Sequence, residues 1–157
     1  FLSACATQPV VLRTVGPGPT TASAGFGQGL LVVYSDTDEI HLDQSSVFYI
    51  HSSYFIQTPT GHQVKWVKNH VSNMDVTPER VALPAGTYLV VARSEDYGRV
   101  RVPVVIEAGR TTEVHLADTW KPRQQVTDAA QLVRFPNGYL IGWAAPATSA
   151  TEGNRSH

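Results

Sequence analysis

The feature that most constrains the fold of this chain is a strict alternation of apolar and polar residues between positions 99 and 106. The apolar residues recur at every second position, and they are Val100, Val102, Val104 and Ile106. Successive side chains of a β-strand point to opposite faces, so this period predicts a strand with one face in the core and Arg101 on the other. Pro103 also lies on that other face and cannot donate a hydrogen bond to a neighbouring strand. We therefore expect an edge strand or a strand interrupted by a bulge.

Similar short patterns precede and follow this run. Residues 81–83 lead through a Pro-Ala-Gly turn into an apolar run at 87–93. Residues 111–116 alternate again, which predicts an inward face and an outward face. The inward residues would be Thr112, Val114 and Leu116, and the outward residues Thr111, Glu113 and His115.

The first half of the chain also consists of short apolar runs separated by turn-forming residues, as in a β protein. Residues 30–34 form a short apolar run between turn formers, which predicts a buried strand. Residues 47–57 and 64–67 flank a Thr-Pro-Thr-Gly turn and predict a hairpin, with one face formed by Tyr54, Ile56, Val64 and Trp66. Together these patterns predict an all-β protein, with an antiparallel β-sandwich of about seven strands over residues 29–118.

A further hairpin is predicted beyond the sandwich. Residues 132–135 and 139–143 are apolar runs that flank Pro136-Asn137-Gly138, and Asn-Gly is a strong signal for a tight turn. Because an isolated hairpin is marginally stable, we expect residues 119–145 to form a linker and a C-terminal β-hairpin packed on the sandwich. Residues 146–157 are expected to be a disordered tail.

The beginning of the sequence carries a targeting signal. Leu2-Ser3-Ala4-Cys5 resembles the cleavage box of bacterial lipoprotein signal peptides. The resemblance implies that residues 1–4 are the remnant of a signal peptide and that Cys5 is lipidated and attaches the protein to a membrane. The alternative is an ordinary thiol near a frayed terminus. Residues 5–28 are rich in Gly, Pro and small polar residues, which predicts a flexible tether. Neutral Ala6 after the cysteine favours the periplasmic face of the outer membrane.

A second resemblance covers roughly residues 29–118. The segments Leu83-Pro84-Ala85-Gly86-Thr87-Tyr88 and 104–116 look like the final half of prealbumin-like sandwiches, which include carboxypeptidase regulatory-like domains and PEGA-type repeats of bacterial surface proteins. The resemblance implies a prealbumin-like fold, in which Gly86 makes a tight entry to a core strand and Tyr88 is half buried. It implies no catalytic role, since such sandwiches are non-catalytic appendages in zinc carboxypeptidases.

Charge and composition exclude several classes of partner. The formal net charge is -1, from 12 basic and 13 acidic residues, so no global field attracts nucleic acid. The single cysteine excludes an intramolecular disulfide. No run of about 18 apolar residues is present, so membrane attachment would depend on lipid at Cys5.

Candidate chemistry is sparse. The six histidines have no metal-binding spacing, and the acidic group Asp36, Asp38, Glu39 and Asp43 lacks the glycine and terminal glutamate of a calcium loop. No serine lies in a nucleophile elbow, so we expect no catalytic residue, metal or cofactor. Trp66, Trp120 and Trp143 could form a platform for stacking sugars.

These observations favour a non-catalytic, lipid-anchored protein of the bacterial cell envelope that acts as a structural or interaction module. Its partner would be another envelope protein or a glycan. The first alternative is a module that binds carbohydrate or peptidoglycan through the three tryptophans. The weakest alternative is a metal-dependent enzyme, which would require at least three His or acidic side chains converging in a cleft.

Overall fold

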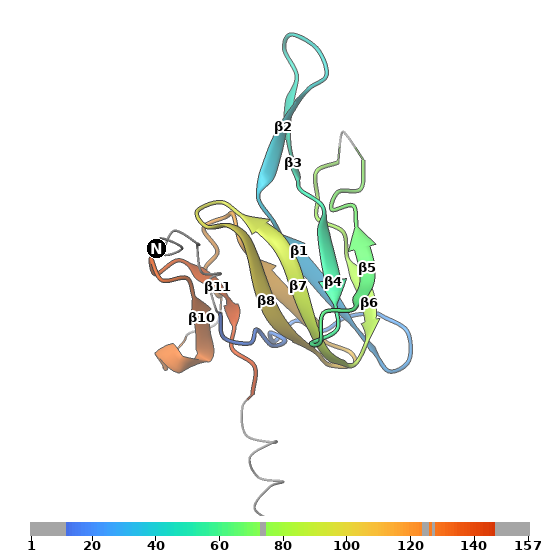
Figure 1. Ribbon diagram of the computed structural model, residues 1–157, viewed down its shortest axis with the longest axis vertical. Helices are drawn as coiled ribbons and strands as arrows, with labels where there is room; N and C mark the ends of the chain where they lie inside the picture. The colour runs from blue at the N-terminus through green and yellow to red at the C-terminus, as the bar shows by residue number, and fades with distance from the viewer. Residues whose placement is uncertain (1–11, 73–74, 124–125, 127, 147–157) are drawn as a thin grey trace, which may run out of the picture.

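The chain folds into two packed β-sheets (Figure 1), as a computed structural model shows for residues 12–72, 75–123, 126 and 128–146. The four-stranded sheet has the order β5-β4-β7-β8, and the three-stranded sheet has the order β6-β1-β9. The strands are β1 (Gln28–Tyr34), β4 (Tyr54–Gln57), β5 (Gln63–Val67), β6 (Val81–Pro84), β7 (Gly86–Ser94), β8 (Gly98–Ile106) and β9 (Thr111–His115). The prediction of an all-β sandwich is confirmed.

The core lies between the two sheets. The alternating residues of β8 are all buried against Leu31 and Val33 of β1 and Val114 of β9, as the period of two predicted. Arg101 faces solvent and β8 is the edge strand of its sheet, so both expectations for this strand are confirmed. Tyr88 is half buried beside the core and donates its hydroxyl proton to Pro84 O.

One strand pairing departs from the antiparallel expectation. β1 runs antiparallel to β6 but parallel to β9, with Leu31 opposite Thr112 and Val33 opposite Val114. Parallel neighbours need a long crossover connection, and here the whole four-stranded sheet lies between β1 and β9 in sequence. This pairing is a property of the topology, and the residue pattern within each strand does not predict it.

The expected strand over residues 47–57 is two separate strands. β2 (Thr37–His41) pairs with β3 (Val47–His51), and this ribbon projects from one end of the sandwich (Figure 1). The chain turns at Ser52, whose backbone N–H and hydroxyl both donate to Asp36 O. These bonds end β3 and redirect the chain into β4. We call residues 37–51 the arm.

The hairpin of β4 and β5 forms as predicted, but its register differs by one residue. Phe55 pairs with Trp66, and Ile56 pairs with Lys65. Tyr54 and Ile56 therefore point into the core, whereas Trp66 lies on the outer face with 51% of its surface exposed. The error arose because Val64 and Trp66 are apolar although they face outward.

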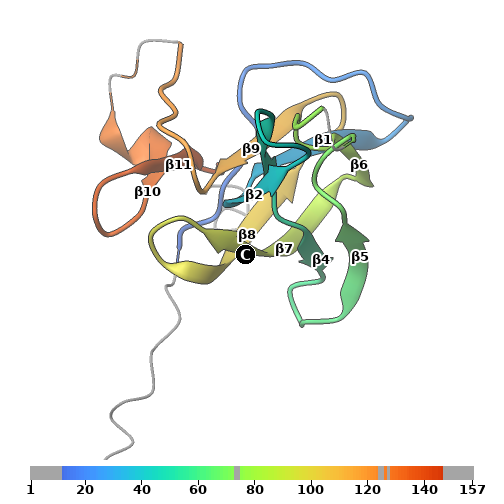
Figure 2. The ribbon, with the colours of Figure 1, turned by 90° about the horizontal axis from the view of Figure 1, so that it is seen from above.

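The C-terminal hairpin consists of β10 (Leu132–Arg134) and β11 (Leu140–Trp143), preceded by a short 3-10 helix, η2 (Ala129–Gln131). It packs beside β9, where Val133, Phe135 and Ile141 are buried in the common core (Figure 2). Gly142 allows the close approach, since a Cβ atom there would lie 2.7 Å from Glu113 O. The apolar side of the hairpin is thus covered within the chain.

Residues 12–22 differ from the expected flexible tether. Val15 is fully buried; its N–H donates to Pro103 O, and its own carbonyl accepts from Val105 N–H. Gly16 N–H donates to Trp143 O, so this segment joins β8 to β11. It covers the edge that Pro103 leaves incompletely paired. Cys5 and the segments 1–11 and 147–157 lie outside the described residues.

Candidate functional site

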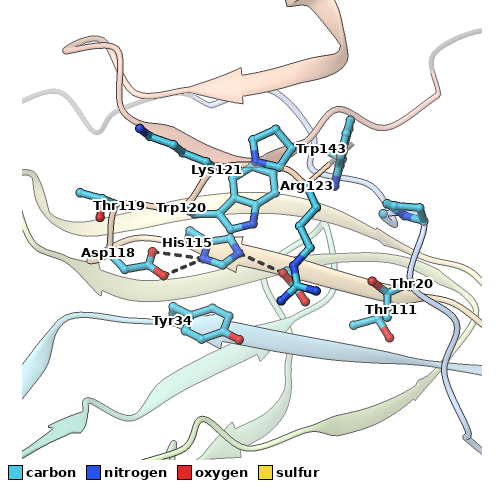
Figure 3. Close-up of a pocket in the computed structure, with 14 residues that line it drawn as sticks. Thr20, Tyr34, Thr111, His115, Asp118, Thr119, Trp120, Lys121, Arg123 and Trp143 are labelled. Carbon is cyan, nitrogen blue, oxygen red and sulfur yellow. Dashed lines mark hydrogen bonds and ion pairs between the residues drawn. The ribbon is translucent and has the colours of Figure 1, made fainter. Parts of the chain in front are cut away.

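The most elaborate group of polar side chains surrounds His115 at the end of β9. The His115 ring is 3% exposed and lies between two aromatic rings (Figure 3). Its centroid is 4.4 Å from that of Tyr34 on β1 and 4.7 Å from that of Trp120 in the linker, with interplanar angles of 7° and 11°. The imidazole of His115 therefore joins β9 to β1 on one side and to the linker on the other.

Both ring nitrogens of His115 face carboxylates. Nδ1 lies 3.0 Å from Asp118 Oδ2, and Nε2 lies 3.1 Å from Glu113 Oε1. Only the doubly protonated ring can donate to both acids. Burial lowers the pKa of His115, but the hydrogen bonds and charges of Asp118 and Glu113 outweigh this effect and raise the pKa above its ordinary value. The imidazolium is also favoured by the two aromatic faces that enclose it.

Tyr34 responds to the same carboxylates. Burial raises the pKa of its hydroxyl, and the negative charges of Glu113 and Asp118 raise it further, while Arg80 opposes them. Because this pKa is raised, the Tyr34 hydroxyl is protonated in the folded protein near neutral pH. Its role here is to support the imidazolium by stacking and not to supply a base.

A cavity of about 570 Å³ lies beside this group and opens to solvent. Its wall is formed on one side by Gly18 to Thr20 and Thr111, and on the other by the linker from Asp118 to Arg123 together with Trp143. The side chain of Arg123 extends into the cavity (Figure 3). The cavity thus combines hydroxyl groups, two linker cations, two carboxylates and the edges of two indoles.

In this arrangement neither ring nitrogen of His115 is free. A general base needs a free lone pair, and the two carboxylates engage both nitrogens of His115. A metal ligand needs the same lone pair, and the described residues contain no group of three or more His, Cys, Asp or Glu placed to hold a metal ion. The polar wall can instead donate to and accept from a ligand with several hydroxyl or charged groups.

Of the three tryptophans singled out in the sequence, two meet at this site. Trp120 and Trp143 contact edge to face, with centroids 6.1 Å apart and an interplanar angle of 78°. One face of Trp120 is occupied by His115, and Trp143 packs against Gly18, where a Cβ atom would lie 2.8 Å from Cδ1 of the indole. Trp66 belongs to β5, at the opposite edge of the molecule (Figure 2). The three do not form one platform.

His115 itself was expected to face outward, and so was Thr111, yet both are buried. The outer side of β9 is covered by the linker and the C-terminal hairpin, which the alternation within residues 111–116 does not reveal. One signal was present in the sequence: acids stand two residues before and three residues after His115. Glu113 lies on the same face of the strand as His115. Asp118 follows three residues later, close enough in the chain to reach the same ring.

The acidic group near the arm has a structural role. Arg93 donates to Asp36 at 2.9 Å and to Asp38 at 2.8 Å, and it also donates to Thr37 O. Asp43 accepts from the backbone of Ser45 and Ser46 at the tip of the arm. These contacts fix the root of the arm to β7 and close its turn.

No protein-family model matches this chain, and no curated protein or solved structure matches it. No helix among the described residues is both long and apolar enough to cross a bilayer.

Proposed function

We propose that the protein is a non-catalytic, lipid-anchored component of the bacterial cell envelope that acts as an interaction module. The support for envelope location is the sequence Leu2-Ser3-Ala4-Cys5 and its resemblance to a lipoprotein cleavage box. The support for an interaction role is the arm, which contributes no residue to the hydrophobic core.

The arm is the observation that carries this proposal. Its two strands pair only with each other in the part of the chain that the structure describes, and neither contributes a residue to the core. Leu42, Val47 and Tyr49 are 45%, 40% and 56% exposed. Large apolar side chains on a projecting ribbon mark a contact surface, since an isolated two-stranded ribbon gains little stability of its own.

Fractionation and in-cell cross-linking test the two parts of the proposal. The full-length precursor should fractionate with membranes, and Cys5→Ser should release it. A photo-crosslinking residue at position 47 should give an adduct, whereas the same residue at Arg134 on the far hairpin should not. Unchanged fractionation of Cys5→Ser would contradict the anchor, and equal adducts at both positions would contradict the arm.

A second candidate function is the binding of a carbohydrate or peptidoglycan fragment in the cavity beside His115. It is favoured by one observation, the combination of indole edges with hydroxyl groups and charges of both signs in a cavity of about 570 Å³. Titration with soluble peptidoglycan fragments should detect binding that Arg123→Ala weakens and Trp66→Ala does not. Equal loss in both variants, or no binding by the original chain, would remove this candidate.

A further inference from the structure

The outer face of the four-stranded sheet is unusually apolar for a surface that no other described strand or helix covers. The strand register places four residues in a row across it, in the order Trp66, Phe55, Val91 and Arg101. A second row holds Gln57, Leu89 and Pro103. Outward positions of an antiparallel sandwich are ordinarily polar. We call the outward residues of β4, β5, β7 and β8 the outer face.

The outer face is also exclusively basic among its charged residues. Its cations are Arg93, Arg99 and Arg101, and no acid occupies an outward position on these four described strands. Arg93 is paired with Asp36 and Asp38, whereas no carboxylate binds Arg99 or Arg101 within the described residues. A partner for this face should therefore present aromatic or aliphatic groups beside negative charge.

The arm of the same chain has this chemistry. No Lys or Arg occurs between Arg13 and Lys65, so the basic residues within the arm are the histidines His41 and His51, of which His41 contacts Glu39. Across its two strands Tyr49 pairs with Glu39 and Val47 pairs with His41, which sets exposed apolar groups beside a carboxylate. The arm projects beyond one end of its own sandwich and does not lie over the outer face (Figure 1). It is positioned to reach a different molecule.

We propose that the arm of one molecule docks on the outer face of a second copy of this chain. Tyr49 and Val47 would pack on the row formed by Phe55 and Trp66, while Glu39 and Asp43 of the arm would neutralise Arg99 and Arg101. In this proposal each molecule donates its arm to one neighbour and receives an arm from another, so assembly proceeds head to tail. This inference rests on the interaction role proposed above and names its partner.

Sedimentation velocity on the full 157-residue chain in reducing buffer tests the inference. The average mass should rise with protein concentration beyond that of a dimer, and less so at high salt, since exposed charge pairs are screened. An arm variant, Val47→Ser with Tyr49→Ser, and a face variant, Arg99→Glu with Arg101→Glu, should each remain monomeric. The control, Arg134→Glu, reverses a charge on the C-terminal hairpin, away from both surfaces, and should assemble like the original chain.

Mixing the two defective variants gives the decisive result. The arm variant keeps an intact outer face and the face variant keeps an intact arm, so an equimolar mixture should form a dimer and nothing larger. A mixture that stays monomeric would overturn the inference, as would an original chain that is monomeric at every concentration. Unchanged melting temperatures of the variants ensure that loss of assembly is not loss of fold.

Two other results would separate this inference from the proposed function. Binding of phosphatidylglycerol vesicles that is lost in the face variant and kept in the arm variant would assign the outer face to an anionic membrane and overturn self-assembly. A monomeric chain whose arm gives an adduct with a different envelope protein would also overturn it, while the interaction role would stand. An arm that gives no adduct and no self-assembly would contradict both.

Discussion

The imidazole of His115 and the indole of Trp120 stack at 4.7 Å with their planes inclined by 11°. The two residues belong to different parts of the fold, since His115 ends β9 and Trp120 belongs to the linker that leads to the C-terminal hairpin. Their contact, with Tyr34 on the other side of the imidazole, ties that linker to the three-stranded sheet. The charge on the imidazole is therefore coupled to the attachment of the linker.

The first prediction is a loss of stability as pH rises. The folded-state pKa of His115 lies above its ordinary value of 6.5, so the folded protein binds this proton more tightly than the unfolded chain. The resulting stabilisation is complete below the unfolded pKa and disappears as pH rises through the higher folded-state pKa. Urea titrations at several pH values should show that the free energy of unfolding decreases as pH rises from about 6.5 through the folded-state pKa of His115.

His115→Gln provides the comparison for that experiment. The other five histidines remain in this variant, so the difference between the two pH profiles isolates the contribution of His115. The profile of the variant should be flatter between the two pKa values. Parallel profiles would show that Glu113 and Asp118 do not hold a proton on this ring.

The second prediction concerns the inward face of β8. Val104 is fully buried, whereas Arg101 on the same strand is exposed. Val104→Ala should lower the free energy of unfolding by roughly 1 to 3 kcal/mol, because it leaves a cavity in a packed core, and Arg101→Ala should change it by nearly zero. Denaturant titration measures both. Equal losses of unfolding free energy in the two variants would contradict the inward position of Val104 and the outward position of Arg101.

The third prediction tests the close approach of β11 to β9. A methyl group on Gly142 would lie 2.7 Å from Glu113 O and 3.0 Å from Cγ1 of Val15, so one of these elements must move. Gly142→Ala should destabilise the protein by about 1 to 3 kcal/mol. Tyr139→Ala, at a residue of the same hairpin that is 58% exposed, is the control and should have little effect. Comparable thermal shifts in both variants would argue against the docked hairpin.

The fourth prediction is that removal of all residues after Asp118 lowers the melting temperature and promotes aggregation. Truncation would uncover β9 and remove Val133, Phe135 and Ile141 from the common core. Newly exposed apolar surface of this kind favours association. Calorimetry and light scattering on the truncated chain measure the two effects. A truncated protein that stays monomeric and melts at the original temperature would show that the hairpin adds nothing to the fold.

The sequence by itself determined the elements whose signals are local. The alternation around Val102 defines a strand and its buried face whatever its neighbours are, and the Asn137-Gly138 turn determines which two strands of the last hairpin pair. The same rule failed at Trp66, because an apolar residue on an exposed face carries the same local pattern as one in the core. The alternation of side chains along a segment shows that it is a strand, but it indicates only indirectly which of its faces is covered.

Tertiary structure alone decided which surfaces are covered. His115 is buried because the linker and the last hairpin return to β9, and Val15 is buried because β8 and β11 leave a gap that its backbone fills. The pairing of Arg93 with Asp36 and the parallel pairing of β1 with β9 likewise join segments more than fifty residues apart. Such contacts depend on the path of the whole chain, which no short stretch of sequence encodes. They raise the pKa of His115 and hold the arm at the end of the sandwich.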